Sequence, residues 1–293
     1  MDQTKPTYHN FNTISPSAKS LLLMKGNTNI PFARQTAELL QYPEKYTPDF
    51  DQKNFDFWTN ILHFEERYWS IDQLLADLSI RNILELSSGF SFRGLETTKQ
   101  KGFYYIDTDL PDVVATKKEL ITALREEGLT TESNFELLPL NALDEKQFHD
   151  TVSHFPKGEI AIVNEGLLMY LDINEKEKLC NIIHNILSER GGCWITADIY
   201  VKSTIGNRHL NKDQKRKEFF DQHRIEDNKF ESFKAAEEFF NRLGYQIDKE
   251  ATVQRSSLSS MKYFLQNGTE KQIGKIRKAG KIRNTWRLRI EPE

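Results

Sequence analysis

Apolar residues recur at helical spacing in the first part of the chain. Between Phe55 and Leu78 they return close to every 3.6 residues, which is typical of a long amphipathic helix packed on a core. Shorter amphipathic stretches precede it at Ser17–Met24 and Gln35–Leu40. The pattern predicts an N-terminal helical layer over residues 1–80, and we expect its abundant aromatic side chains to pack in the core of the same fold.

From Arg81 onward the pattern changes to short apolar runs separated by amphipathic stretches. The runs that we predict to be strands are Arg81–Leu86, Phe103–Ile106, Phe135–Leu140, Ile160–Val163, Cys193–Ala197 and Tyr245–Val253. Strands that alternate with helices form a parallel sheet with helices on both faces. We therefore predict an α/β fold over residues 81–293, doubly wound around a mostly parallel seven-stranded sheet.

The seventh strand has two candidates near the C-terminus. Met261–Leu265 is apolar enough, but Thr285–Ile290 has the more regular alternation of apolar and polar residues. We prefer the second candidate. The segment Gly268–Gly280 between them then becomes a basic helix, and we expect its lysine and arginine side chains to face solvent.

One long segment, residues 201–229, interrupts the alternation after the fifth strand. It is charged and poor in aliphatic residues, and it follows a strand at the edge where open α/β sheets bind ligands. We predict a lid-like insertion. A solvated surface insertion without a chemical role is the alternative.

Composition narrows the class of protein. A net charge of −3 argues against a general nucleic-acid or anionic-membrane binder. No apolar run approaches the roughly 20 residues of a membrane span, and the polar N-terminus favours a cytoplasmic protein. The two cysteines, Cys180 and Cys193, are too few for a disulfide framework or a zinc site, so we expect reduced core residues and no metal.

The stretch from Arg81 to Asp112 carries the main chemical signal. A strand leads into the turn Ser87–Ser88–Gly89, a helix follows, and a second strand ends in Asp107 and Asp109. This order is typical of nucleotide-binding units, in which the terminal acid accepts hydrogen bonds from ribose hydroxyls. A pyrophosphate-binding turn needs more glycines, and Ser87 stands where one would be. The pattern favours S-adenosylmethionine, with a plain strand-to-helix turn as the alternative.

Polar residues follow the other predicted strands as well. Asn141–Asp144 comes after the third strand and Asn164–Gly166 after the fourth. In an open α/β sheet these ends meet at one edge, where the ligand binds. Together with the first two strand ends they predict a site for ribose, adenine and methionine.

Four motifs resemble the leucine carboxyl methyltransferase family, which includes bacterial O-methyltransferases of polyketide type. The motifs are Asn164–Leu171 (E-G-x-x-x-Y-L), Asp109–Pro111 followed by Lys117–Lys118, Glu85–Phe90, and Ile30–Arg34. They occur in the family's order and span most of the chain. The resemblance implies a Rossmann-like class I methyltransferase that uses S-adenosylmethionine and releases S-adenosylhomocysteine.

The resemblance also implies the residues that bind the methyl donor. They are Lys25, Arg34, Ser87, Gly89, Asp109, Asn141, Ala142 and Glu165. Arg34 would pair with the donor's carboxylate, Asp109 would accept the ribose hydroxyls, and Glu165 would lie near the reacting centre. Two residues depart from the family: Ser87 replaces a glycine, and Asn141 stands where relatives often have Asp.

The implied reaction is an in-line transfer of a methyl group to a carboxylate or hydroxyl oxygen of a small molecule. A phenol would benefit from a base, and the candidate catalytic or acceptor-lining residues are Tyr170, Tyr200, His209 and His223. A catalytically idle binding protein and a nicotinamide-dinucleotide oxidoreductase are the alternatives. We expect no nucleic-acid or membrane partner, and the sequence specifies no oligomeric state.

Overall fold

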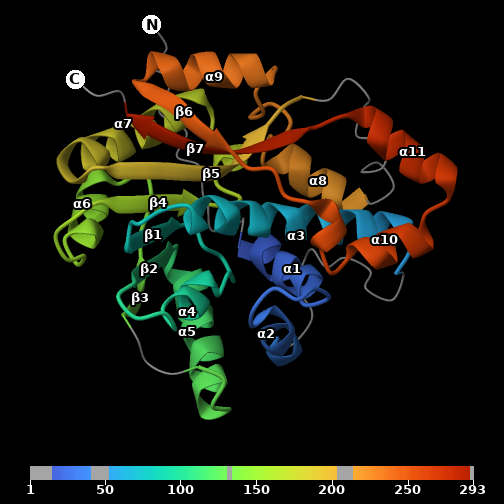
Figure 1. Cartoon of the computed structure of the whole chain (residues 1–293), viewed down its shortest axis with the longest axis horizontal. Coiled ribbons are helices and arrows are strands. Elements are labelled where there is room, and N and C mark those ends of the chain that lie inside the picture. The colour runs from blue at the N-terminus through green and yellow to red at the C-terminus, as the bar shows by residue number, and fades with distance from the viewer. Residues whose placement is uncertain (1–14, 41–52, 131–133, 203–213, 291–293) are drawn as a thin grey trace, which may run out of the picture.

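A seven-stranded mixed sheet forms the centre of the computed structural model, which describes residues 15–40, 53–130, 134–202 and 214–290 (Figure 1). The strand order is β3-β2-β1-β4-β5-β7-β6. Strands β1 to β5 pair in parallel, whereas β7 lies antiparallel between β5 and β6. The strands are β1 Asn82–Leu86, β2 Tyr104–Asp109, β3 Phe135–Pro139, β4 Ile160–Asn164, β5 Gly192–Tyr200, β6 Tyr245–Glu250 and β7 Arg283–Ile290.

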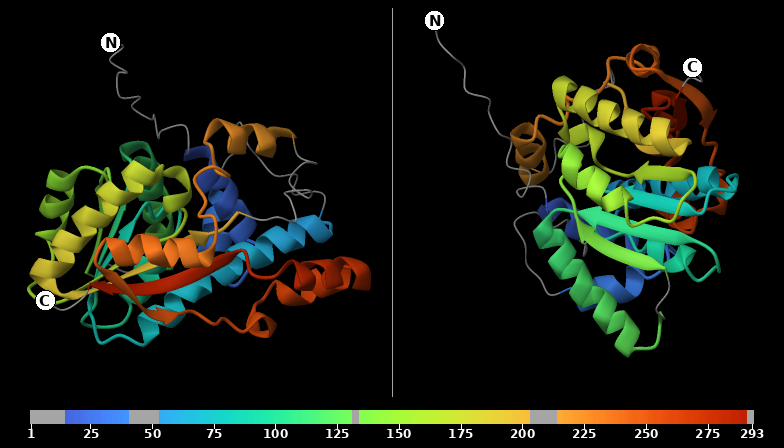
Figure 2. Two further views of the ribbon diagram at one scale, coloured as in Figure 1. Left: turned by 90° about the horizontal axis from the view of Figure 1, so that it is seen from above. Right: turned by 90° about the vertical axis from the view of Figure 1, so that its left-hand side faces the viewer.

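Helices cover both faces of this sheet, α3 on one side and α7 on the other (Figure 2). The α-helices are α1 Ser15–Lys25, α2 Ala33–Leu39, α3 Phe55–Ala76, α4 Arg93–Thr97, α5 Pro111–Glu126, α6 Glu145–Val152, α7 Ile173–Arg190, α8 Gln214–Gln222, α9 Phe233–Arg242, α10 Met261–Asn267 and α11 Glu270–Ala279. The short 3₁₀ turns are η2 Leu168–Tyr170 and η4 Arg255–Ser257.

Alternation along the strands decides which side chain faces which layer. In β1, Leu84 and Leu86 join the core under α6, α7 and α9, whereas Ile83 joins the core under α3. Every residue of β1 and β4 is buried, as expected for central strands with helices on both faces. Ile71 and Leu74 of α3 share the core of Ile83, so the N-terminal helices pack directly on the sheet.

The structure confirms the predicted sheet of mostly parallel strands and identifies the seventh strand. β7 contains the preferred Thr285–Ile290, whereas the other candidate, Met261–Leu265, is wrong because it forms α10. Phe264 of that helix packs against Phe55 of α3, with ring centroids 5.1 Å apart. Tertiary packing, which the apolar run could not specify, makes the segment helical.

The insertion after β5 contains α8, while residues 203–213 within it lie outside the described residues. Its lid-like role stays a prediction. Both cysteines are buried and free, and burial raises the pKa of Cys193 to about 11. In the described part of the chain, no helix combines the length and apolar character that crossing a membrane requires.

Candidate active site

A cavity of about 780 Å³ opens at the edge of the sheet where the parallel strands end. This volume falls in the range typical of small-molecule sites. The predicted residues that line it are Lys25, Ser87, Gly89, Asp109, Asn141, Ala142, Glu165, Tyr170 and Tyr200. The structure therefore brings together, in one cavity, the ends of the first four strands and residues from α1 and β5.

The turn after β1 has an unusual backbone conformation. Ser87 and Gly89 both have positive φ angles, 49° and 51°. Glycine adopts this left-handed region freely, whereas a serine there costs about 1 kcal/mol. Ser87 thus adopts the backbone conformation that a glycine would adopt in this turn, at the cost of local strain. Strain of this kind concentrates at functional sites.

Asp109, at the end of β2, faces this turn. One carboxylate oxygen accepts a hydrogen bond from the Gly89 N–H and the other from the Leu110 N–H, both at 2.7 Å. Burial raises the pKa of Asp109, while the two backbone hydrogen bonds oppose that rise. Each oxygen retains a lone pair, so the fixed carboxylate can accept two hydroxyl groups of a vicinal diol such as a ribose.

Glu165, just after β4, is surrounded by cations. Its Oε1 lies 2.6 Å from Lys25 Nζ and 3.0 Å from Arg67 Nε, and its Oε2 lies 3.4 Å from Arg93 Nη2. Burial by itself would raise the pKa of Glu165, but the three cations lower it to about 2. The carboxylate is therefore ionised at neutral pH. Burial lowers the pKa of Lys25, against the attraction of Glu165.

The cations around Glu165 are not equally neutralised. Arg93 also pairs with Asp72 and with Glu85, whereas Lys25 and Arg67 share Glu165 as their one carboxylate partner in the described part of the chain. Arg67 is 2% exposed, and its Nη2 has no hydrogen-bond partner among the described residues. A buried, unpartnered guanidinium nitrogen beside a cavity indicates a place for an anionic ligand group.

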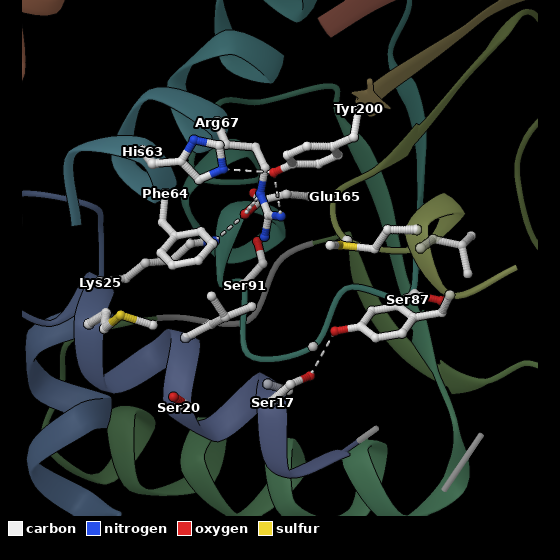
Figure 3. A pocket seen from close by; sticks show the side chains of 18 of the residues that line it. Ser17, Ser20, Lys25, His63, Phe64, Arg67, Ser87, Ser91, Glu165 and Tyr200 are labelled. Carbon is white, nitrogen blue, oxygen red and sulfur yellow. Dashed lines mark hydrogen bonds and ion pairs between the residues drawn. The ribbon is translucent and has the colours of Figure 1, made fainter. Parts of the chain in front are cut away.

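Tyr200 continues this network toward α3. Its hydroxyl lies 2.8 Å from His63 Nε2 and accepts a hydrogen bond of 3.3 Å from Arg67 Nη1. Figure 3 shows Arg67 between the Tyr200 hydroxyl and the Glu165 carboxylate. A phenol and an imidazole therefore stand next to the charged cluster, where they can hold or accept a proton.

A buried carboxylate fixes the loop that carries Glu165. Asp198 of β5 accepts hydrogen bonds from the backbone N–H groups of Gly166 at 2.7 Å and of Leu167 at 2.6 Å. It also accepts one from the Asn164 side chain at 2.7 Å. The E-G motif thus owes its shape to a residue of the neighbouring strand, which sequence analysis did not identify.

Two of the predicted residues that the structure describes, Arg34 and His223, do not line the cavity. Arg34 is exposed on α2 and borders a separate hollow beside α10, because Phe32 and Ala33 take the buried positions of its segment. Arg34 thus does not share the cavity with the other predicted residues that bind the methyl donor. His223 packs against Phe219, with ring centroids 4.5 Å apart, and does not line the cavity. His209 lies outside the described residues.

The face of α3 that lines the cavity was not predicted from the sequence. The residues of this face that line the cavity, at positions i, i+3, i+4 and i+7 of one helix stripe, are Asn60, His63, Phe64 and Arg67. Phe64 belongs to the apolar residues that the sequence pattern predicts for the core, whereas Asn60, His63 and Arg67 have no role in that prediction. The spacing itself was a signal that this second face meets another surface.

Comparisons with known proteins do not assign the chain to a family. No family model and no curated protein sequence matches the chain. The chain is similar to the magnesium protoporphyrin IX methyltransferase of Synechocystis PCC 6803, solved with bound SAH, at 11% identity and a TM-score of 0.48, over 95% of this chain and 99% of that one.

Two further solved structures are of the same kind. Mitomycin 7-O-methyltransferase MmcR is 11% identical, with a TM-score of 0.46, over 97% of this chain and 69% of that one. A TehB-like SAM-dependent methyltransferase from Corynebacterium glutamicum is 12% identical, with a TM-score of 0.40, over 78% and 88%. These similar structures are methyltransferases, but TM-scores below 0.5 do not decide a function. None of the comparisons supports the leucine carboxyl methyltransferase family specifically.

Proposed function

We propose that the protein is an S-adenosylmethionine-dependent methyltransferase that transfers a methyl group to an oxygen atom of a small molecule. The observation that carries this proposal is the pairing of two subsites in one cavity. Asp109 offers a fixed carboxylate for a diol, and Glu165 with Lys25 and Arg67 offers both charges needed for an amino acid. An adenosyl amino acid carries both groups.

In this proposal each donor group has a partner in the chain. Glu165 receives the α-ammonium group, while Arg67 Nη2, helped by Lys25, receives the α-carboxylate. Asp109 binds the ribose, and Asn141 with Ala142 borders the adenine. Arg67 thus takes the role that the sequence resemblance gave to Arg34.

The residues of the cavity would act mainly by positioning. When bound, S-adenosylmethionine supplies a methyl group already activated on a sulfonium, so the chain has to align the acceptor and exclude water. Alignment of this kind is worth about 7–11 kcal/mol. A carboxylate acceptor needs no base, whereas a hydroxyl acceptor would give its proton to the pair of Tyr200 and His63.

Isothermal titration with S-adenosylhomocysteine tests the donor site. We expect wild type to bind, and Arg67→Gln to bind roughly 10- to 100-fold more weakly, because a hydrogen bond to a charged group contributes about 1.5–3 kcal/mol. Arg34→Gln is the matched control and should bind like wild type. Melting of each variant without ligand checks that its fold is retained.

Several outcomes would contradict the proposal or one of its residue assignments. NADH is titrated in the same way, and tighter binding of NADH than of S-adenosylhomocysteine would favour an oxidoreductase. If the protein binds neither compound, the proposed methyltransferase activity is wrong. Binding of S-adenosylhomocysteine without methylation of any acceptor in a mass-spectrometric screen would favour the catalytically idle binding protein. A loss of affinity in Arg34→Gln but not in Arg67→Gln would restore the assignment from the sequence.

A further inference from the structure

The cavity has two parts with different walls. We call the part at the strand ends, lined by Ser87, Asp109, Asn141 and Glu165, the donor half, and the part lined by α8 and α11 the outer half. The outer half has mostly apolar and aromatic walls, contributed by Met24, Phe64, Met169, Phe219, Phe220 and Ile276. Figure 1 shows α8 and α11 beyond the sheet, far from its β3 edge.

The two halves differ in the charges that line them: the donor half combines acids with the cations Lys25 and Arg67, whereas the described charged residues of the outer half are all lysines. Among the described residues, the acids that line the cavity are Asp109 and Glu165, both in the donor half. The charged residues that line the outer half are Lys229, Lys275 and Lys278. Lys229 pairs with Glu226. The other two lysines have no ion-pair partner in the part of the chain that the structure describes.

Two lysines of α11 lie on the face of the helix that borders the cavity. Lys275 and Lys278 are three positions apart, so they share one face, and the apolar Ile276 and Ala279 beside them also line the cavity. Lys271 of the same helix does not line it. Lys275 and Lys278 are exposed, as expected for the solvated side of this basic helix, and they also border the mouth of the cavity.

We propose that the outer half binds the methyl acceptor, and that the acceptor is an apolar or aromatic molecule with an anionic group. Lys275 and Lys278 hold this group, a carboxylate or another small oxyanion, at the mouth of the cavity. The apolar walls hold the body, which leaves the reacting oxygen at the inner end, toward Tyr200. The inference rests on the proposed function, because it assigns the second substrate of the same reaction.

A pair of fluorescent probes with the same apolar body tests the charge preference. The anionic probe is 8-anilinonaphthalene-1-sulfonate, and N-phenyl-1-naphthylamine is the same molecule without the sulfonate. Both are titrated into wild type saturated with S-adenosylhomocysteine. We expect one-to-one binding, with the anionic probe bound more tightly.

Two double variants separate local charge from net charge. Lys275→Gln/Lys278→Gln should weaken the anionic probe about tenfold and leave the neutral probe within about twofold. The control Lys118→Gln/Lys271→Gln removes the same net charge from exposed positions off the cavity and should change neither probe. Ala279→Trp, which fills part of the outer half, should weaken both probes.

The outcomes distinguish this inference from the proposed function. Equal binding of the two probes, equal losses in both double variants, or no effect of Ala279→Trp would overturn the anionic acceptor. If S-adenosylhomocysteine does not bind while the probes behave as expected, the proposed function fails and the anion site stands. If S-adenosylhomocysteine binds equally well to all variants but the two probes bind with equal affinity, the inference of an anionic acceptor is wrong and the proposed function stands.

Discussion

The two halves of the cavity are stabilised in different ways. In the donor half, Asp109 accepts two backbone hydrogen bonds and Glu165 pairs with cations of neighbouring helices, while the buried Asp198 behind them fixes the loop that carries Glu165. In the outer half, apolar side chains from separate helices meet, and the lysines at its mouth are exposed. The donor half is therefore held by many fixed polar contacts, whereas the shape of the outer half depends on helix packing.

The outer half nevertheless has one strong connection to the rest of the fold. Glu65 of α3 is fully buried and accepts four hydrogen bonds of 2.5–2.9 Å, from the backbone N–H and the hydroxyl of both Ser259 and Ser260. These serines directly precede α10, which leads into α11. Glu65 thus anchors the start of α10, while Ile273 and Ile276 of α11 pack against the apolar cluster around Phe55.

The largest effect is expected for Glu165→Gln, which removes the charge that Lys25 and Arg67 share. Removing one partner of a buried ion pair typically costs about 3–5 kcal/mol, and we expect a loss of this size in the free energy of unfolding in urea. Glu96→Gln, whose carboxylate is 45% exposed and pairs with Lys99, is the control and should lose less than about 1 kcal/mol. Similar losses in both variants would show that the donor half is no more dependent on charge than the surface.

The pH dependence of the free energy of unfolding also tests how much the charge of Glu165 contributes to stability. Glu165 has a pKa of about 2 in the folded protein against 4.5 ordinarily, so its contribution is complete above about pH 4.5 and is lost as the pH falls toward 2. The shift corresponds to roughly 3 kcal/mol. We expect the stability difference between wild type and Glu165→Gln to narrow between pH 5 and pH 3 in urea titrations. A constant difference would mean that packing, and not charge, causes it.

A smaller effect is expected for Asp109→Asn, and on ligand affinity more than on stability. Loss of a charge-assisted hydrogen bond to the ribose should weaken binding of S-adenosylhomocysteine by about 10- to 100-fold in calorimetry. Asp112→Asn, an exposed acid in the first turn of α5, is the control. Adenosine should lose affinity in Asp109→Asn but not in Arg67→Gln. The reverse result would mean that the ribose lies at Arg67 and the amino-acid group at Asp109.

The smallest effect is expected for Glu65→Gln, which retains an acceptor but loses the charge that the serines bond. We expect a loss of about 1–2 kcal/mol and faster amide hydrogen exchange in residues 259–279, with β1 unchanged. Glu66→Gln, the neighbouring residue that pairs with Arg255, should leave exchange in this segment close to wild type. Faster exchange throughout the molecule would contradict a local role for Glu65.

Much of the fold and of the donor half could be predicted because the relevant signals are local. A strand, its turn and the acid after the next strand are close in sequence, so Asp109 and the turn at Ser87 followed from pattern alone. The alternation in Thr285–Ile290 likewise identified the seventh strand. Its place between β5 and β6 depends on pairing with distant strands, which alternation does not specify.

By itself, the sequence determined an α/β sheet with polar strand ends at one edge, since periodicity records which side chains are buried. Only the tertiary structure decided which cations meet Glu165. Lys25 lies 140 positions before it and Arg67 lies 98 positions before it, on helices that meet at the sheet edge only after folding. The same packing turned Arg34 outward and placed Lys275 at the mouth of the cavity. Periodicity defines the faces of a helix, but the partner of each face is set by long-range packing.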